Sequence, residues 1–284
     1  MSFHKQVKSS DGPQIISADK VKFHPPTGIS VLVVGAGVGG VMAALECRRK
    51  GHSVRLVERA PSPSTAGKFP CHVWHTICAT PLHYIYRTES SPLGPAGDFF
   101  SIGANVIRHF YDFWPDLAAE LKRINYEGWV AYHKITGERV SGPEPPMLGD
   151  LKFDLADGTK KTIPFNRHNR PKFIAALLAQ VAGVGVDITY GKRVVDYFED
   201  HETNKAGVIF EDGGRLDADV VIAADGVGTK SNKLVNGHDI RAYPSGFSIF
   251  RTAFPIEIAM ADPEIRERWP LLEGGRPYVE LWGG

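Results

Sequence analysis

The sequence has few cysteines, no long apolar run and almost no net charge. Its 284 residues contain three cysteines, an odd number that argues against a secreted disulfide scaffold. No apolar run reaches the roughly 18 residues that a membrane-spanning helix needs. The formal net charge is +1 and no basic run stands out, so neither nucleic acid nor an anionic membrane is indicated as a partner. These absences leave a soluble globular protein of one large or two small domains.

The first 28 residues also lack the apolar region of a signal peptide. They are polar and carry two separate proline-containing stretches, Gly12-Pro13 and Pro25-Pro26. We therefore expect residues 1–28 to form a flexible extension before the fold begins. We also expect a cytoplasmic protein in a reducing, intracellular compartment.

A glycine motif follows the first strongly apolar run. Residues 31–34 (VLVV) have the β-branched character of a buried parallel strand. Gly35, Gly37 and Gly40 then give the spacing G-x-G-x-x-G. In this motif the first glycine permits a tight turn, the second lets the backbone approach a pyrophosphate, and the third lets the helix pack on the strand. A glycine turn without a ligand is the plainer alternative.

The residues after the motif complete a dinucleotide-binding unit. The pattern predicts a helix over 38–50, whose first amide groups would face the phosphates, and a second strand over 53–57. Glu58 follows that strand, where a carboxylate can hold a ribose hydroxyl. An acid at this position disfavours the 2′-phosphate of NADP in this pocket. The motif leaves FAD and NAD open.

A second signature lies in residues 218–232, ADVVIAADGVGTKSN. A buried strand over 220–224 ends in Asp225-Gly226. Here the chain resembles the FAD-dependent aromatic-ring monooxygenases related to salicylate and para-hydroxybenzoate hydroxylases, with Asp219, Asp225 and Gly226 at matching positions. The resemblance implies an α/β fold: a Rossmann-like FAD/NAD(P)-binding domain of the glutathione-reductase type with a β-rich substrate domain. It also implies that Asp225 and Gly226 lie beside the cofactor. The alternative is that this sequence marks only the end of a strand with an Asx turn.

Two arginines match further elements of this family. Arg170 precedes an apolar helix like the family's R-x-x-L-x-x-x-L element, whose arginine contacts the cofactor, with Phe173 in place of the first leucine. Arg251 lies in SGFSIFRTAFP and corresponds to an arginine treated as catalytic in fungal members. Each could instead be a solvent-exposed cation. His168, between two arginines, is interpreted as a polar loop residue.

The strands expected between these motifs cover 186–190, 193–199, 206–211 and 215–217, with a hairpin turn at Asp212-Gly213-Gly214. This succession is typical of the end of a dinucleotide fold and its crossing β-ribbon.

Residues 68–97 interrupt the family's spacing. Their Cys71, His72, His75 and Cys78 suggest a metal site, but four ligands so close together lack the loop separation of structural zinc sites, and we predict no metal. Removing the segment restores the spacing to the loop GDFFSIGANV. Codons for Gly67 to Phe69 and for Ala96-Gly97 can contain splice donor and acceptor sequences. We therefore hypothesise that 68–97 is a translated, retained intron.

The family's third fingerprint, a Gly-Asp followed by Ala-x-His-x-x-x-Pro, is missing from the chain. We expect a C-terminally truncated member with an FAD-binding domain at 29–240 and the start of a substrate domain at 241–284. The resemblance implies FAD as cofactor, NAD(P)H as co-substrate, O2, and an aromatic or polyketide-like substrate. The alternatives are a flavin- or NAD-dependent dehydrogenase on the same fold and an inactive FAD-binding remnant.

Overall fold

The computed structural model describes residues 16, 19–63, 99–126, 128–145, 152–162, 166–240, 242–247, 256–275 and 278–283. The chain divides into two compact units, each described by itself below. The first comprises Met1–Pro61 and Ile174–Ile240, and the second Ser62–Phe173 and Arg241–Gly284. The first unit ends where the sequence predicts the end of the FAD-binding domain, but residues 62–173 cluster with the second unit. The roles assigned to 29–240 and 241–284 stay a prediction.

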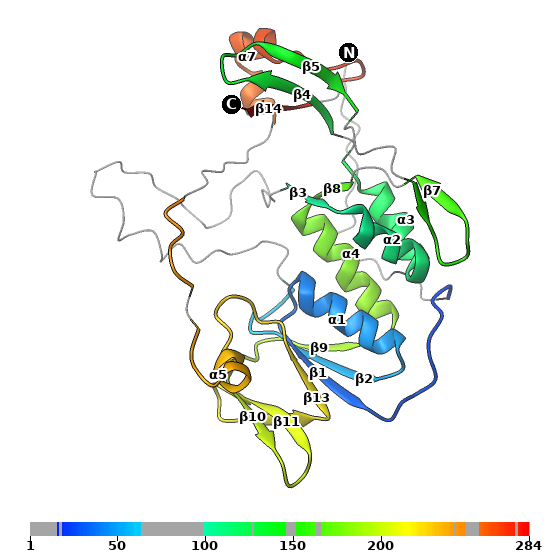
Figure 1. Ribbon diagram of the computed structural model, residues 1–284, viewed down its shortest axis with the longest axis vertical. Helices are drawn as coiled ribbons and strands as arrows, with labels where there is room; N and C mark the ends of the chain where they lie inside the picture. Colours follow the sequence, from blue (N-terminus) through cyan, green and yellow to red (C-terminus); the bar gives the residue numbers. More distant parts are fainter. Residues whose placement is uncertain are drawn as a thin grey trace. The chain divides into compact units, whose positions relative to one another are not determined.

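The first unit is built on a parallel sheet of four strands in the order β13-β1-β2-β9 (Figure 1). All three pairings are parallel, so the four strands end at one common edge. The buried side chains of β1 show why this strand is central, since no residue from Val31 to Val34 is more than 3% exposed. The strands are β1 Ser30–Val34, β2 Ser53–Val57, β9 Asp187–Thr189 and β13 Val220–Ala223. The strands predicted over 31–34, 53–57 and 220–224 are thus confirmed.

Helix α1, Val38–Arg49, connects β1 to β2 and packs against both strands (Figure 1). It buries Val41, Ala44 and Leu45, which recur at helical spacing on one side. Gly51 ends the connection at a φ of +88°, a left-handed conformation that favours glycine. The helix predicted over 38–50 is therefore confirmed to within one residue.

The described part of the predicted N-terminal extension is anchored, contrary to expectation. His24 N donates to the Arg49 carbonyl oxygen at 2.8 Å, and Thr27 N donates to the Gly51 carbonyl oxygen at 3.0 Å. The Arg49 carbonyl is one of those that the end of helix α1 leaves without an intrahelical partner, and Gly51 follows that helix. Val21 is also buried, at 8% exposed. Residues 21–27 therefore belong to the first unit.

An antiparallel ribbon of three strands, β10-β11-β12, adjoins the sheet. Its strands are β10 Val194–Asp200, β11 Lys205–Phe210 and β12 Arg215–Ala218, and helix α5 spans Ser231–Asn236. The predicted hairpin turn joins β11 to β12, with Gly213 at a φ of +81°. One core cluster ties ribbon to sheet: Leu32, Val34, Val57, Tyr197, Val208, Phe210 and Ala218.

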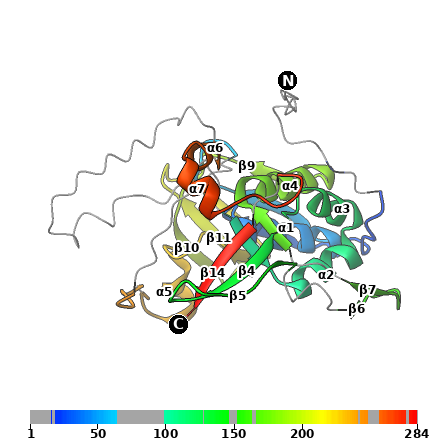
Figure 2. The same ribbon diagram turned by 90° about the horizontal axis from the view of Figure 1, so that it is seen from above.

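The second unit contains a three-stranded sheet in the order β14-β4-β5. Strand β14, Tyr278–Gly283, runs parallel to β4, Trp129–Lys134, and Figure 2 shows these distant segments side by side. Strand β5, Arg139–Glu144, pairs antiparallel with β4. The remaining pairs are β3 Phe99–Ile102 with β8 Asn166–Asn169, and β6 Lys152–Asp154 with β7 Lys160–Thr162. The helices are α2 Ala104–Phe113, α3 Pro115–Arg123, α6 Ile256–Met260 and α7 Pro263–Arg268. Helix α4, Arg170–Gly183, crosses the boundary between the units.

A buried carboxylate links β14 to α7 within the second unit. The Glu280 side chain is 7% exposed and lies 3.3 Å from Arg268 Nη1 and 3.3 Å from His133 Nε2. Trp282 Nε1 donates to the same carboxylate at 3.2 Å, and its ring stacks on His133. Burial alone would raise the pKa of Glu280, but the hydrogen bond from Trp269 and the charge of Arg268 outweigh it and the pKa is lowered. This acid is therefore held in its charged form.

Within the described ranges, no helix is long and apolar enough to cross a membrane. Arg251, the segment 68–97 and its four cysteine and histidine residues lie outside those ranges. The predictions that concern them are therefore neither supported nor contradicted by the structure.

Candidate functional site

The glycine loop lies at the common edge where the parallel strands of the first unit end. Gly35 follows β1 with a φ of +99°, and a Cβ atom there would lie 2.6 Å from the Ala224 carbonyl oxygen. A Cβ atom on Gly40 would overlap the Gly35 carbonyl oxygen. Both positions therefore require glycine, because the obstructing atoms belong to the backbone. This geometry matches the tight turn and close helix packing predicted for them.

Gly37 differs from these two glycines, because no atom of the described residues lies within 4 Å of the position of an added Cβ. It is the N-cap residue of α1, in an extended conformation, and no side chain caps the helix there. Gly37 thus offers the first amide groups of α1 no capping side chain, and the positive end of the helix dipole lies at this point. Such a helix start is suited to bind a phosphate.

Glu58 lies at the end of β2, beside the glycine loop. Its Oε2 accepts a hydrogen bond from Ala36 N at 2.7 Å, and its Oε1 accepts one from Ala60 N at 2.8 Å. The carboxylate therefore braces the loop, a role that the sequence did not indicate. A carboxylate can accept about four hydrogen bonds, so capacity remains for a ribose hydroxyl. Tyr190, which the sequence suggested only as a strand end, lies nearby: burial and then the Glu58 charge raise its pKa.

The Asp225-Gly226 turn follows β13 at the same edge. The Asp225 Cα lies 3.0 Å from the position of an added Gly35 Cβ, so the turn borders the glycine loop directly. Gly226 has a φ of +86°, and Thr229 N donates to its carbonyl oxygen at 3.1 Å. Asp225 is half-buried, and its Oδ1 is a buried atom with no hydrogen-bond partner among the described residues. A buried acceptor of this kind indicates a missing donor.

Asp219, the third residue of the second signature, lies away from this edge. Its Oδ2 accepts hydrogen bonds from Ser30 N at 2.7 Å and Ser30 Oγ at 2.6 Å, at the beginning of β1. Its Oδ1 lies 2.5 Å from Lys205 Nζ. The hydrogen bond from Lys205, followed by those from Ser30, lowers the pKa of Asp219 far below its usual range. Asp219 therefore ties strands together and has no place in the candidate site.

The two predicted residues near α4 have different surroundings. Arg170 is the first residue of α4 and is exposed, a placement compatible with both the cofactor contact and the plain solvent-exposed cation. His168 is not a polar loop residue, because it lies in β8, is 0% exposed and packs against Phe173 with ring centroids 5.4 Å apart. Burial lowers the pKa of His168, and neither ring nitrogen has a hydrogen bond of regular geometry among the described residues. The residues next to His168 in sequence are polar, so the sequence did not show that alternate side chains of β8 are buried.

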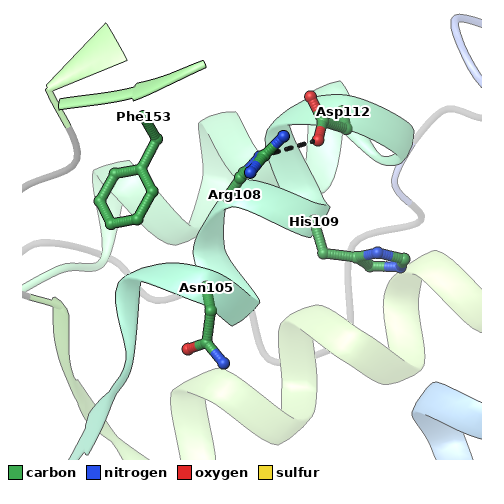
Figure 3. A pocket seen from close by; sticks show the side chains of 5 residues that line it. All are labelled: Asn105, Arg108, His109, Asp112 and Phe153. Atoms are coloured by element: carbon green, nitrogen blue, oxygen red, sulfur yellow. Dashed lines mark ion pairs between the residues drawn. The ribbon is translucent and has the colours of Figure 1, made fainter. Parts of the chain in front are cut away.

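A shallow pocket of about 270 Å³ lies on α2 in the second unit (Figure 3). Its lining is Asn105, Arg108, His109, Asp112 and Phe153. Arg108 and Asp112 form an ion pair across it at 3.5 Å, and Asp112 Oδ1 also accepts from Ala156 N at 2.8 Å. The charged groups are thus already paired with one another. Among the described residues, this pocket included, no group of three or more His, Cys, Asp or Glu side chains could hold a metal.

The fold and the edge of the first unit define a nucleotide-binding α/β protein of the Rossmann type. The FAD dependent oxidoreductase family matches residues 30–139. The chain is 37% identical to the FAD-dependent monooxygenase fsr3 of Gibberella fujikuroi over 92% of its length, and 36% identical to the FAD-dependent monooxygenase dmxR9 of Cryptosporiopsis sp. over 89%. It covers 44% and 43% of those proteins, and so spans less than half the length of these curated relatives.

A solved structure supports the fold. CtdE in complex with FAD superposes with a TM-score of 0.60 and 23% identity, covering 89% of this chain and 52% of that one. At this identity the likeness concerns the fold alone. The comparisons thereby confirm the predicted α/β, Rossmann-like fold and the predicted resemblance to FAD-dependent monooxygenases. The residues present fit FAD, because the loop provides glycines where a Cβ would collide, an uncapped helix start and a half-buried acid after β2.

Proposed function

We propose that this chain forms the FAD-binding part of a monooxygenase that transfers one oxygen atom from O2 to an aromatic or polyketide-like small molecule, with NAD(P)H as reductant. The observation that carries the proposal is the convergence of the glycine loop, Glu58 and Asp225 at one edge of the parallel sheet. The similarity to fungal FAD-dependent monooxygenases supports this function over that of a simple dehydrogenase. A cytoplasmic, intracellular location stays a prediction.

Each residue of the edge has a proposed task. Gly35 and Gly40 bring the start of α1 close to β1, and Gly37 leaves room for the pyrophosphate against the amide groups. Glu58 accepts a hydrogen bond from the adenosine ribose while it braces the loop. Asp225 and Gly226 lie beside the cofactor.

Bound FAD would supply the redox chemistry, in which NAD(P)H provides two electrons, one oxygen atom enters the substrate and the other leaves as water. The protein's own residues bind and orient the groups that react. Arg170 would contact the cofactor from the start of α4, and Arg251 would orient the substrate or the flavin. Both assignments rest on the family resemblance.

The first test is Gly37→Val, studied by titration of the purified chain with FAD. Gly37 has φ of −70° and ψ of 175°, which valine adopts without strain, and the space around it is open. We expect the dissociation constant for FAD to rise more than tenfold, since the side chain would occupy the place of the pyrophosphate. The free energy of unfolding should stay within about 0.5 kcal/mol of wild type. Gly283→Val is the matched control, because Gly283 likewise has no described atom within 4 Å of an added Cβ but lies on β14, outside the glycine loop, and the variant should keep full affinity.

Equal FAD affinity of the Gly37→Val and wild-type chains would contradict the site. The activity itself is tested by NAD(P)H-dependent O2 consumption with aromatic substrates. Reduction of the flavin without incorporation of oxygen from ¹⁸O2 into any product would instead indicate a reductase.

A further inference from the structure

Tyr197 occupies a position beneath the candidate site that the sequence did not indicate. It lies on β10 and is 8% exposed. Its ring belongs to the core cluster that contains Val34 and Val57. These two residues end β1 and β2 and directly precede Gly35 and Glu58. The aromatic ring therefore packs under the edge where the cofactor would bind, although β10 belongs to the antiparallel ribbon.

Tyr197 and Asp225 adjoin consecutive residues at the end of β1, because Tyr197 shares a core cluster with Val34 and the Asp225 Cα lies 3.0 Å from the position of an added Cβ on Gly35. Tyr197 Oη and Asp225 Oδ1 are both buried, and neither has a hydrogen bond of regular geometry within the described part of the chain. The Asp225 carboxylate and the Thr229 hydroxyl are nevertheless the polar groups that act on the phenol: burial first, and then Asp225, raise the pKa of Tyr197, whereas Thr229 lowers it. A phenol O–H donor and a carboxylate acceptor are therefore both buried at the end of β1, and neither has a hydrogen bond of regular geometry among the described residues.

The turn that carries Asp225 is held by its own hydrogen bonds. Thr229 Oγ1 lies 2.9 Å from Ser231 Oγ and accepts from Ser231 N at 3.2 Å. Helix α5, which begins at Ser231, also packs against β10. Ser231 is thus hydrogen-bonded to Thr229, and Thr229 and Asp225 are the polar groups that act on the Tyr197 phenol.

A carboxylate next to a phosphate-binding loop poses an electrostatic difficulty. Asp225 borders Gly35, so an unrestrained negative charge would repel the pyrophosphate. A hydrogen bond from a neutral phenol would fix one oxygen inside the protein and disperse part of its charge. The other oxygen would then be directed toward hydroxyl or amide donors of the cofactor.

We propose that Tyr197 is a positioning residue, whose phenol O–H donates to the buried oxygen of Asp225 and fixes that carboxylate for binding of the flavin nucleotide. This proposal rests on the proposed function, because it assigns a partner to a residue of the same site. It adds Tyr197 and, through it, Thr229 to the residues that determine affinity for FAD. The interaction is a hydrogen bond within the protein, with no contact between Tyr197 and the cofactor.

The test is a double-mutant cycle between Tyr197→Phe and Asp225→Asn, measured as the dissociation constant for FAD. Tyr197→Phe keeps the ring and removes only the O–H, and we expect it to weaken FAD binding about tenfold. In the Asp225→Asn background the same substitution should change the affinity less than about twofold, because the charge on which it acts is gone. Tyr111→Phe is the matched control: Tyr111 is also a partly buried tyrosine whose pKa burial raises, but it lies on α2. It should leave FAD binding unchanged.

The outcomes separate this proposal from the proposed function. If the wild-type chain binds no FAD, both proposals are overturned. If wild type binds FAD and Tyr197→Phe weakens binding equally in both backgrounds, the effect comes from packing and the positioning role is wrong. Should Tyr197→Phe fail to fold, Thr229→Val provides a second cycle with Asp225→Asn. Additive effects there would also refute the proposal, and coupled effects would support it.

Discussion

Replacement of Gly40 by alanine is expected to damage the fold, whereas replacement of Gly37 should damage only binding. The added Cβ of Gly40→Ala would overlap the Gly35 carbonyl oxygen, so the start of α1 must move away from β1. The obstructing atom belongs to the backbone of a loop that Glu58 also holds, through Ala36 N at 2.7 Å. Overpacking against a rigid neighbour costs about 1–3 kcal/mol.

An opposing effect must be subtracted from this cost. Alanine is a better helix former than glycine by roughly 1 kcal/mol, and Gly40 lies within the first turn of α1. The net loss of unfolding free energy should therefore be at most about 2 kcal/mol, measured as a lower midpoint in urea-induced unfolding. Gly39→Ala, one residue earlier and with open space around it, isolates the helix gain and should raise the midpoint. A Gly40→Ala chain as stable as Gly39→Ala would refute the packing argument.

Two further predictions concern buried ionisable groups. Because burial lowers the pKa of His168, the folded state binds this proton less readily than the unfolded state, so stability is full above pH 6.5 or so and falls as the pH is lowered. His168→Gln should flatten that slope in urea midpoints measured from pH 8 to 5, and an unchanged slope would exclude His168 as its cause. Glu280→Gln removes a buried carboxylate that Arg268 and Trp282 share, and it should cost about 1–2 kcal/mol, because Arg268 is 41% exposed and can be hydrated. Glu138→Gln, at an exposed ion pair with Lys134, should cost about 0.5 kcal/mol, and equal effects of the two glutamine variants would contradict this account.

Local sequence patterns were sufficient to predict where the glycine loop and Glu58 lie in the fold. The β-branched run, the three glycines and the helix lie within one short segment, and each follows from backbone geometry that neighbouring residues determine. Glu58 lies beside the glycine loop, because a parallel strand must deliver its next residue to the same edge, and its contact with a ribose stays a prediction. The sequence did not reveal that its carboxylate accepts from Ala36 and Ala60.

The second signature shows that a residue can match a sequence motif without lying in the candidate site. Asp219 and Asp225 lie six positions apart, at opposite ends of β13, so only one of them can reach the cofactor edge. Lys205 and Ser30 hold Asp219 at the other end. A linear motif cannot distinguish these two roles, because it does not say where a strand begins and ends relative to its neighbours.

His168 was assigned to the surface because charged residues flank it. In an extended strand, successive side chains point to opposite sides, and the pairing of β8 with β3 places His168 inside. The sequence likewise predicted the strand that contains Tyr197 and named Asp225, but it did not show that these two residues lie near each other. Their proximity depends on the ribbon folding back over the ends of β1 and β2.

The sequence by itself determined β1, α1 and β2 and indicated a dinucleotide cofactor, because glycine spacing, β-branched runs and an acid after the second strand act over a few residues. Only the tertiary structure decided which polar groups are buried together: Glu58 with the loop amides, Tyr197 with Asp225, and Glu280 with Arg268 and His133. The physical reason is that these contacts join residues far apart in the chain. Their energies depend on burial, which the packing of strands and helices creates.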